Sequence, residues 1–113
     1  MRSLGDRNGG NARQVRLMRL IVHPAARLEL DAALAWCKAT FGGSTATRLQ
    51  RRFEQAGELL MREPLLGAPA SGRTRKFALR KFPFTLVYRV EAESITVLSV
   101  AHQSRKPGFW RGR

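Results

Sequence analysis

The first half of the chain repeats its apolar residues at the spacing of an α-helix. This repeat predicts one helix that begins at Pro24, because proline is tolerated in a first helical turn, and ends at Gly42-Gly43. A second helix is expected from Ser44, which can cap it, to Pro64. Because the link is so short, the two helices should pack as an antiparallel hairpin. The predicted buried faces contain Leu30, Ala33, Leu34, Cys37 and Phe41 in the first helix and Leu49, Phe53, Ala56 and Leu60 in the second.

After the second helix, a turn-rich loop over 64–72 leads into segments whose apolar residues alternate with period two. Such alternation is typical of β-strands, and Phe82-Pro83 separates the first alternating segment from the next. The last apolar run should lie centrally in the sheet, because both of its faces are apolar. Together the patterns predict an α+β fold of order β-α-α-β-β-β, in which the helical hairpin covers one face of a small antiparallel meander. Strands are expected at 16–22, 73–80, 84–91 and 95–101.

The length of 113 residues favours a single domain, which we assign to 16–113. Residues 1–15 are rich in Gly and Asn, lack any period, and are predicted to form a flexible tail. Met18 lies at the start of the first strand, so the residues before it are expected to be an upstream start-codon extension rather than part of the domain. Deleting it should leave the melting temperature almost unchanged.

The net charge of the chain limits the kinds of molecule that it is expected to bind. The chain carries 21 basic and 8 acidic side chains, a net charge of +13, and residues 62–113 hold 11 of the basic and 3 of the acidic ones. Such a protein is attracted to polyanions or to an acidic protein.

Cys37 is the single cysteine, and the two histidines lie far apart in sequence, so we predict no disulfide, metal or cofactor. No apolar run is long enough for a membrane span or signal peptide, and a cytoplasmic protein is expected.

Three segments resemble the RelE/ParE superfamily of toxins from bacterial type II toxin–antitoxin modules. They are His-Pro-Ala-Ala with Glu-Leu over 23–30, Phe-Pro-Phe-Thr-Leu-Val-Tyr-Arg-Val over 82–90, and Val-Leu-Ser-Val-Ala-His with Arg-Lys-Pro-Gly-Phe-Trp over 97–110. The resemblance implies the same β-α-α-β-β-β fold. It also implies neutralisation by a cognate antitoxin, whose acidic, partly disordered segment covers a basic groove in a toxin–antitoxin hetero-oligomer.

Members of this superfamily act in two ways. ParE-like toxins bind DNA gyrase without cleaving nucleic acid, whereas RelE-like toxins enter the ribosome and cleave mRNA. By resemblance, His102 as a base and Arg105 as a phosphate contact are the candidate catalytic residues if the chain is a ribonuclease. Gln103 and Phe109, however, stand where RelE-like toxins carry a catalytic arginine and tyrosine. The sequence therefore favours the ParE-like action, and whether the protein is an enzyme stays open.

Several residues have both a binding and a structural interpretation. Arg73 and Arg75 form a groove floor or a solvated strand edge. Arg89 either contacts a phosphate or the antitoxin, or is partly buried and pairs with Glu91 or a backbone carbonyl. The arginines of the second helix, at 48, 51 and 52, are solvated or help to hold gyrase, and Arg80-Lys81 is a solvated corner. A nucleic-acid-binding module without toxicity is a third hypothesis, resting on charge alone. The predicted target or antitoxin groove comprises Arg73, Arg75, Arg89, Arg105, Lys106, Phe109 and Trp110.

Overall fold

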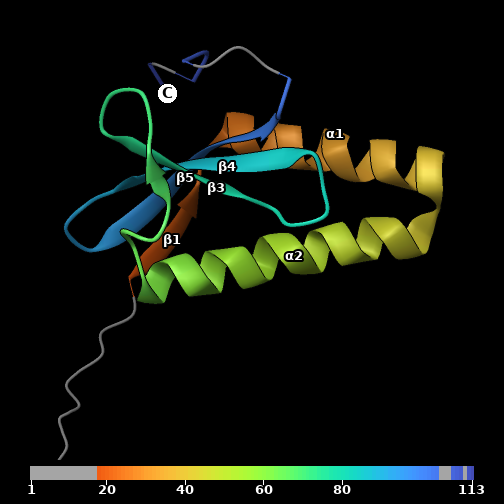
Figure 1. The fold of residues 1–113 in the computed structure, drawn as a ribbon, viewed down its shortest axis with the longest axis horizontal. Helices are drawn as coiled ribbons and strands as arrows, with labels where there is room; N and C mark the ends of the chain where they lie inside the picture. Colours follow the sequence, from red (N-terminus) through yellow and green to blue (C-terminus); the bar gives the residue numbers. More distant parts are fainter. Residues whose placement is uncertain (1–17, 105–107, 111) are drawn as a thin grey trace, which may run out of the picture.

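The computed structural model describes residues 18–104, 108–110 and 112–113. In this part of the chain, two helices pack against one face of a five-stranded sheet, which confirms the predicted α+β class (Figure 1). One short strand, β2, lies within the predicted loop and is an addition to the predicted order. The elements are β1 (Arg19–Val22), α1 (Pro24–Phe41), α2 (Gly43–Arg62), β2 (Ala68–Pro69), β3 (Thr74–Ala78), β4 (Phe84–Val90) and β5 (Ser94–His102).

The strands lie in the order β1-β5-β4-β3-β2. Strands β3, β4 and β5 form the predicted antiparallel meander, and β2 pairs antiparallel with β3. Strand β1 pairs parallel with β5, with Val22 opposite Val97 at the end of the pairing. Beyond that pair no described strand pairs with β5 on this side, and the Val100 N–H there donates to the carboxylate of Glu29 in α1. A register shift between Val87 and Tyr88 interrupts the pairing of β4 with β5.

The two helices are joined through a single glycine. Gly42 has a φ of 99°, a conformation that favours glycine, and its N–H donates to the carbonyl of Lys38 at 3.0 Å. Its carbonyl accepts from the N–H of Ala46, so Gly42 closes α1 and also begins α2. The expectation that Ser44 caps the second helix is therefore wrong, because α2 begins one residue earlier, at Gly43.

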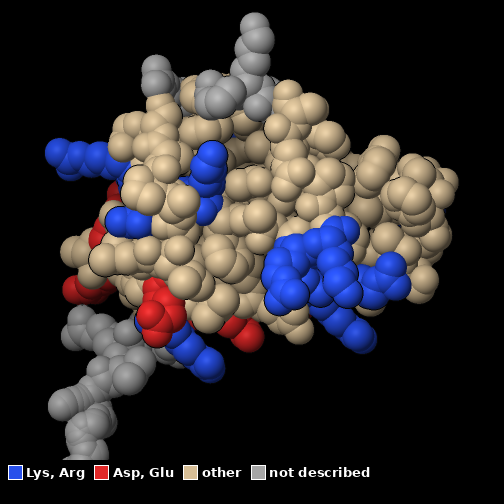
Figure 2. All heavy atoms as spheres, in the orientation of Figure 1, with Lys and Arg blue, Asp and Glu red and all other residues tan. Residues whose placement is uncertain are grey.

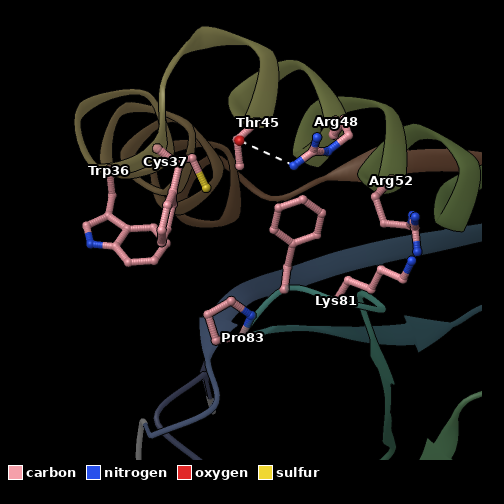
Figure 3. Close-up of a pocket in the computed structure, with 9 residues that line it drawn as sticks. Trp36, Cys37, Thr45, Arg48, Arg52, Lys81 and Pro83 are labelled. Carbon is pink, nitrogen blue, oxygen red and sulfur yellow. Dashed lines mark hydrogen bonds between the residues drawn. The ribbon is translucent and has the colours of Figure 1, made fainter.

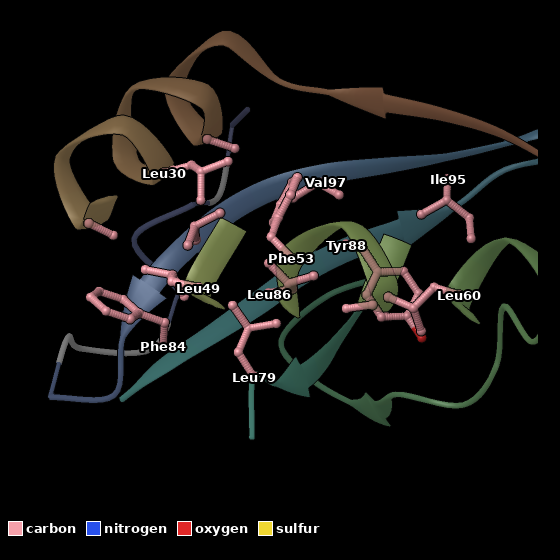
Figure 4. Packing of buried hydrophobic residues seen from close by; sticks show 14 of the residues in the cluster. Leu30, Leu49, Phe53, Leu60, Leu79, Phe84, Leu86, Tyr88, Ile95 and Val97 are labelled. Carbon is pink, nitrogen blue, oxygen red and sulfur yellow. The ribbon is translucent and has the colours of Figure 1, made fainter. Parts of the chain in front are cut away.

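The main core lies between the hairpin and the sheet, and Figure 4 shows its side chains meeting from both layers. Eight of the nine apolar residues predicted for the helices belong to this core or pack against it. Phe41 is the exception, since 61% of its surface is exposed. It is the last residue of α1, where the tips of the helices extend past the sheet, so no strand covers it (Figure 1). Its ring instead meets the edge of Trp36.

Tyr88 joins the loop after α2 to the centre of the sheet. It is fully buried in the main core, and its hydroxyl donates to the carbonyl of Pro64 at 2.7 Å. The same oxygen accepts from the N–H of Gly67 at 2.8 Å. A Cβ at position 67 would lie 2.6 Å from this hydroxyl oxygen, so the close approach requires glycine. This contact positions the chain just before β2.

Candidate functional site

The face of the sheet opposite the helices, which we call the open face, carries a small second core. Val87 and Leu98 lie on it, and Trp110 packs over them with only 6% of its surface exposed. The Phe109 ring meets Trp110 edge-on, with centroids 5.2 Å apart. The C-terminal aromatic pair therefore closes the edge of a core.

Arg113 links the C-terminal segment to α1 through contacts of its side chain. Its guanidinium forms two parallel contacts with the carboxylate of Glu29, at 3.0 and 3.1 Å, and donates to the Leu98 carbonyl at 2.8 Å. Glu29 also accepts from the Ser99 hydroxyl and from the Val100 N–H on the part of β5 that β1 leaves free. Burial raises the pKa of Glu29, but these donors outweigh it and the pKa lies below its ordinary value.

A shallow groove of about 290 Å³ runs beside this C-terminal segment. Arg73, Arg89, Trp110 and Arg113 all contribute to its walls. The guanidinium of Arg89 lies 3.2 Å from the carboxylate of Glu91, one of the two structural partners considered for it. The pKa of Glu91 is lowered, first by a hydrogen bond from the hydroxyl of Thr96 and then by Arg89. Arg73 forms no ion pair within the described residues, so it brings positive charge to the groove.

A second hollow of about 490 Å³ lies on the same face, towards the ends of β4 and β5. Lys76 and Thr85 line it together with His102, Gln103 and the C-terminal aromatic pair at 109 and 110. Trp110 lines both hollows, so they adjoin on the open face. The exposed ring of His102 accepts a hydrogen bond from the backbone N–H of Ser104 through Nδ1, and its edge meets Phe84.

Arg75 lies on the other face. It is opposite Tyr88 in the register of β3 and β4, and cross-strand neighbours share a face of the sheet. Its guanidinium donates to the carbonyls of Leu65 and Gly67 at 3.2 and 2.7 Å, which holds the loop before β2. Of the predicted groove, the structure therefore gathers Arg73, Arg89, Phe109 and Trp110 around the open face and separates Arg75 from them. Arg105 and Lys106 lie outside the described residues.

Two basic residues of the open face, Lys76 and Arg113, were absent from the predicted groove. Side chains on a strand point alternately to its two faces, and Arg75 shares a face with Tyr88. The alternation of β3 could therefore have placed its neighbour Lys76 on the open face. Arg113 sits in a short terminal segment that has no period, so no local signal identifies its contact with Glu29.

Within the described ranges, no group of three or more His, Cys, Asp or Glu side chains is placed to hold a metal ion. No described helix combines the length and hydrophobicity that crossing a membrane would require.

Comparison with known proteins gives the family. A family model described as the ParE toxin of the type II toxin–antitoxin system parDE matches residues 20–107. The solved structure of a chromosomal ParDE TA system from P. aeruginosa has the same fold, with a TM-score of 0.66. The match is 21% identical in sequence and covers 76% of this chain and 96% of the other. No curated protein matches the sequence. The family model spans most of the chain, and the solved ParDE structure has the fold described above. The chain therefore belongs to the ParE toxin family of type II toxin–antitoxin systems.

Proposed function

We propose that this toxin stops growth by binding DNA gyrase through the open face of its sheet, without cleaving nucleic acid. The main support comes from the two positions at which ribonucleases of this superfamily carry catalytic side chains. Position 103 holds an amide and position 109 a phenyl ring, and neither transfers a proton at neutral pH. Phe109 is packed against Trp110, and this packing favours a binding surface rather than a catalytic site.

The charge of the open face suits such a contact. Arg73 and Lys76 are exposed, and Arg89 and Arg113 lie beside them along the two hollows. Cations around an aromatic centre are typical of binding surfaces, in which buried rings supply affinity and the charged rim sets orientation. We propose Arg73, Arg89, Phe109 and Trp110, with Arg105 and Lys106 from the predicted set, as target contacts.

The test is a supercoiling assay with purified gyrase, ATP and relaxed plasmid. The unaltered toxin is expected to block supercoiling at concentrations near that of the enzyme. Charge reversal in a double variant, Arg73→Glu with Lys76→Glu, should weaken inhibition at least tenfold. The matched control, Arg27→Glu with Arg19→Glu, changes two exposed cations that line neither hollow and should leave inhibition within about threefold of the unaltered toxin.

Primer extension on translated mRNA separates the alternatives. Under the proposal, induction of the toxin stops growth without cuts phased to codons. Phased cuts that disappear in His102→Ala would instead establish a ribosome-dependent endonuclease. Harmless overexpression with salt-dependent binding to any duplex would leave only the nucleic-acid-binding module.

The ParE family implies a cognate ParD antitoxin as partner. We propose that this antitoxin holds the toxin in a hetero-oligomer through an acidic segment that orders on binding. Since gyrase acts on chromosomal DNA, the proposal places the toxin in the cytoplasm. A free, buried Cys37 is compatible with the reducing conditions there.

A further inference from the structure

The helical side of the molecule carries a second basic surface, separate from the open face. Figure 2 shows it as the largest cluster of lysine and arginine in this view, over α2 and the turn between β3 and β4. We call it the basic ridge, and its members are Arg48, Arg51, Arg52, Arg80 and Lys81. None of them lines either hollow of the open face. Arg52 is half-buried and the other members are exposed, so the ridge presents its charge to solvent.

The spacing along α2 brings three of these cations together on one side of the helix. Arg51 and Arg52 follow Arg48 by three and four residues, and such neighbours lie about 5–6 Å apart between Cβ atoms. Arg48, Arg52 and Lys81 line a hollow of about 640 Å³, and Figure 3 shows them gathered at one end of it. The guanidinium of Arg52 donates to the Arg80 carbonyl at 3.1 Å. The helix and the turn therefore hold their cations in a fixed relation to each other.

The basic ridge lacks counter-charges. None of its members forms an ion pair with a carboxylate among the residues that the structure describes. Arg48 donates to the hydroxyl of Thr45 at 3.3 Å, and Glu54 of the same helix accepts from Gln50. The first turn of α2 contains no acidic residue and no side chain caps it, so nothing at that end offsets the positive charge. Like charges gathered in this way repel, and a polyanion would relieve the repulsion.

Lys81 holds a strained backbone position at the tip of the ridge. Its φ is 71°, and in the described part of the chain it is the one residue other than glycine with a positive φ. The Phe82 N–H donates to the Leu79 carbonyl at 3.0 Å, which closes a β-turn with Arg80 and Lys81 at its centre. A positive φ at the second central position of a turn favours glycine. Strain of this kind is retained at functional sites, and here it places a lysine beside the arginines of α2.

We propose that the basic ridge binds the phosphate backbone of duplex DNA, namely the DNA on which gyrase acts while the open face holds the enzyme. A duplex carries one phosphate per about 1.7 Å of its axis, so each cation of the ridge can meet one. The planar arginine fork suits phosphate oxygens, and such contacts require no particular base sequence. Evenly spaced phosphates match exposed cations from two elements, whereas a tight protein contact needs buried apolar anchors, which the ridge itself does not supply. The proposal rests on the proposed function only for the source of the DNA.

The first experiment measures the Kd of the full-length toxin for a fluorescently labelled duplex without gyrase. The ridge variant combines Arg48→Gln, Arg51→Gln and Arg52→Gln, and its Kd at 0.1 M salt is expected to rise about tenfold or more. Glutamine is a good helix former, so α2 should be retained, and equal melting temperatures would verify this.

The matched control removes the same amount of charge from another part of the surface. It combines Arg19→Gln, Arg27→Gln and Lys38→Gln, three exposed cations outside the ridge that line none of the hollows described above. Its Kd should rise less than about threefold, because only the long-range field changes. Each triple variant removes three positive charges from a net charge of +13, so equal losses of affinity would overturn the proposal.

The salt dependence counts the phosphate contacts directly. Each contact contributes about 0.9 to the slope of log Kobs against log salt concentration, so the ridge variant should flatten this slope by about 2–3. The control variant should flatten it by less than about 1. An unchanged slope in the ridge variant would show that its arginines do not contact phosphates, which would also overturn the proposal.

Glycine at position 81 separates binding from stability. Lys81→Gly relieves the left-handed backbone, so the melting temperature should be no lower than that of the unaltered toxin. The Kd for the duplex should nevertheless rise about threefold, because one phosphate contact is lost. Lys38→Gln, at an exposed lysine of α1, is the control and should leave the Kd nearly unchanged. A Kd for Lys81→Gly that also stays unchanged would mean that this lysine is only a solvated corner, contrary to the proposal.

Assays with gyrase separate this proposal from the proposed target. The ridge variant is expected to bind gyrase normally in the absence of DNA, but about fivefold more of it should be needed to block supercoiling. If the unaltered toxin does not inhibit supercoiling, the target is wrong and the duplex affinities still decide the ridge. If the ridge variant binds the duplex normally and loses affinity for gyrase or for the antitoxin, the ridge is a protein-binding surface and the present proposal fails.

Discussion

Tyr88 is the largest of the fully buried side chains, and its hydroxyl links two backbone groups of the loop after α2. Replacing it in Tyr88→Phe removes one atom and leaves the Gly67 N–H and the Pro64 carbonyl without their partner. Leaving a buried polar group unpaired costs about 1–3 kcal/mol, so the free energy of unfolding should fall by that amount in urea melts. A loss below about 0.5 kcal/mol would show that water replaces the hydroxyl.

A substitution at Gly67 tests the same contact between the loop after α2 and Tyr88. In Gly67→Ala the new Cβ would approach the Tyr88 ring at 2.7 Å and the Lys76 carbonyl oxygen at 2.8 Å, and the latter is backbone that cannot move aside. Overpacking of this kind costs about 1–3 kcal/mol, measurable as a lower midpoint of thermal unfolding. Gly43→Ala is the control, because nothing lies within 4 Å of a Cβ there. Equal losses in the two variants would mean that backbone freedom, and not the close approach, sets the cost.

At the scale of elements, the local periods of the sequence predicted the helices and the meander. Leu49, Phe53 and Leu60 repeat at helical spacing over about three turns, and β5 is apolar on both faces, so each pattern has one interpretation. Strand β2 has two residues, Ala68 and Pro69, too few to show a period. The parallel pairing of β1 with β5 joins segments some 75 residues apart, and no local pattern encodes such a contact.

The candidate site was predictable to the extent that it depends on local patterns. The Phe109-Trp110 pair is recognisable as the closure of a core, and the pairing of Arg89 with Glu91 follows from their proximity in sequence. Strand alternation puts Arg73 and Arg75 on one side of the chain, but Thr74 is where β3 begins, so Arg73 does not follow the strand. The hollow lined by Trp36, Arg48 and Lys81 depends on how the hairpin tips lie over the turn between β3 and β4, which is a property of tertiary packing.

The contact between Glu29 and Arg113 joins α1 to the C-terminal segment, and it should respond to pH. Because the folded-state pKa of Glu29 lies below its ordinary value, its stabilisation is present above about pH 4.5 and is lost as the pH falls through the folded value. Glu29→Gln should therefore cost about 1–2 kcal/mol at pH 6, and this cost should shrink as the pH is lowered below about 4.5, measured by urea denaturation. Glu91 also has a lowered pKa but is present in both proteins, so its effect cancels. A difference that stays constant with pH would exclude a role for the carboxylate charge.

At the scale of the whole molecule, the proposed target surface lies on the open face of the sheet, away from the helices. That face carries the C-terminal aromatic pair and the cations beside it. The net charge of +13 acts over the whole surface, since a field of one sign attracts any acidic partner whichever face receives it. The overall charge should thus govern how fast partners meet, and short-range contacts should govern how long they stay.

Kinetics with the antitoxin separate these two effects of charge. Between ionic strengths of about 0.05 and 0.5 M, the association rate constant of the unaltered toxin should fall at least tenfold, because salt screens the long-range field. The dissociation rate constant should change much less, because it reports short-range contacts. Arg51→Glu with Arg62→Glu changes two exposed arginines of α2 and should lower the association rate much more than it alters dissociation. If dissociation sped up as much as association slowed, these arginines would contact the antitoxin directly and would not act through the field of the molecule.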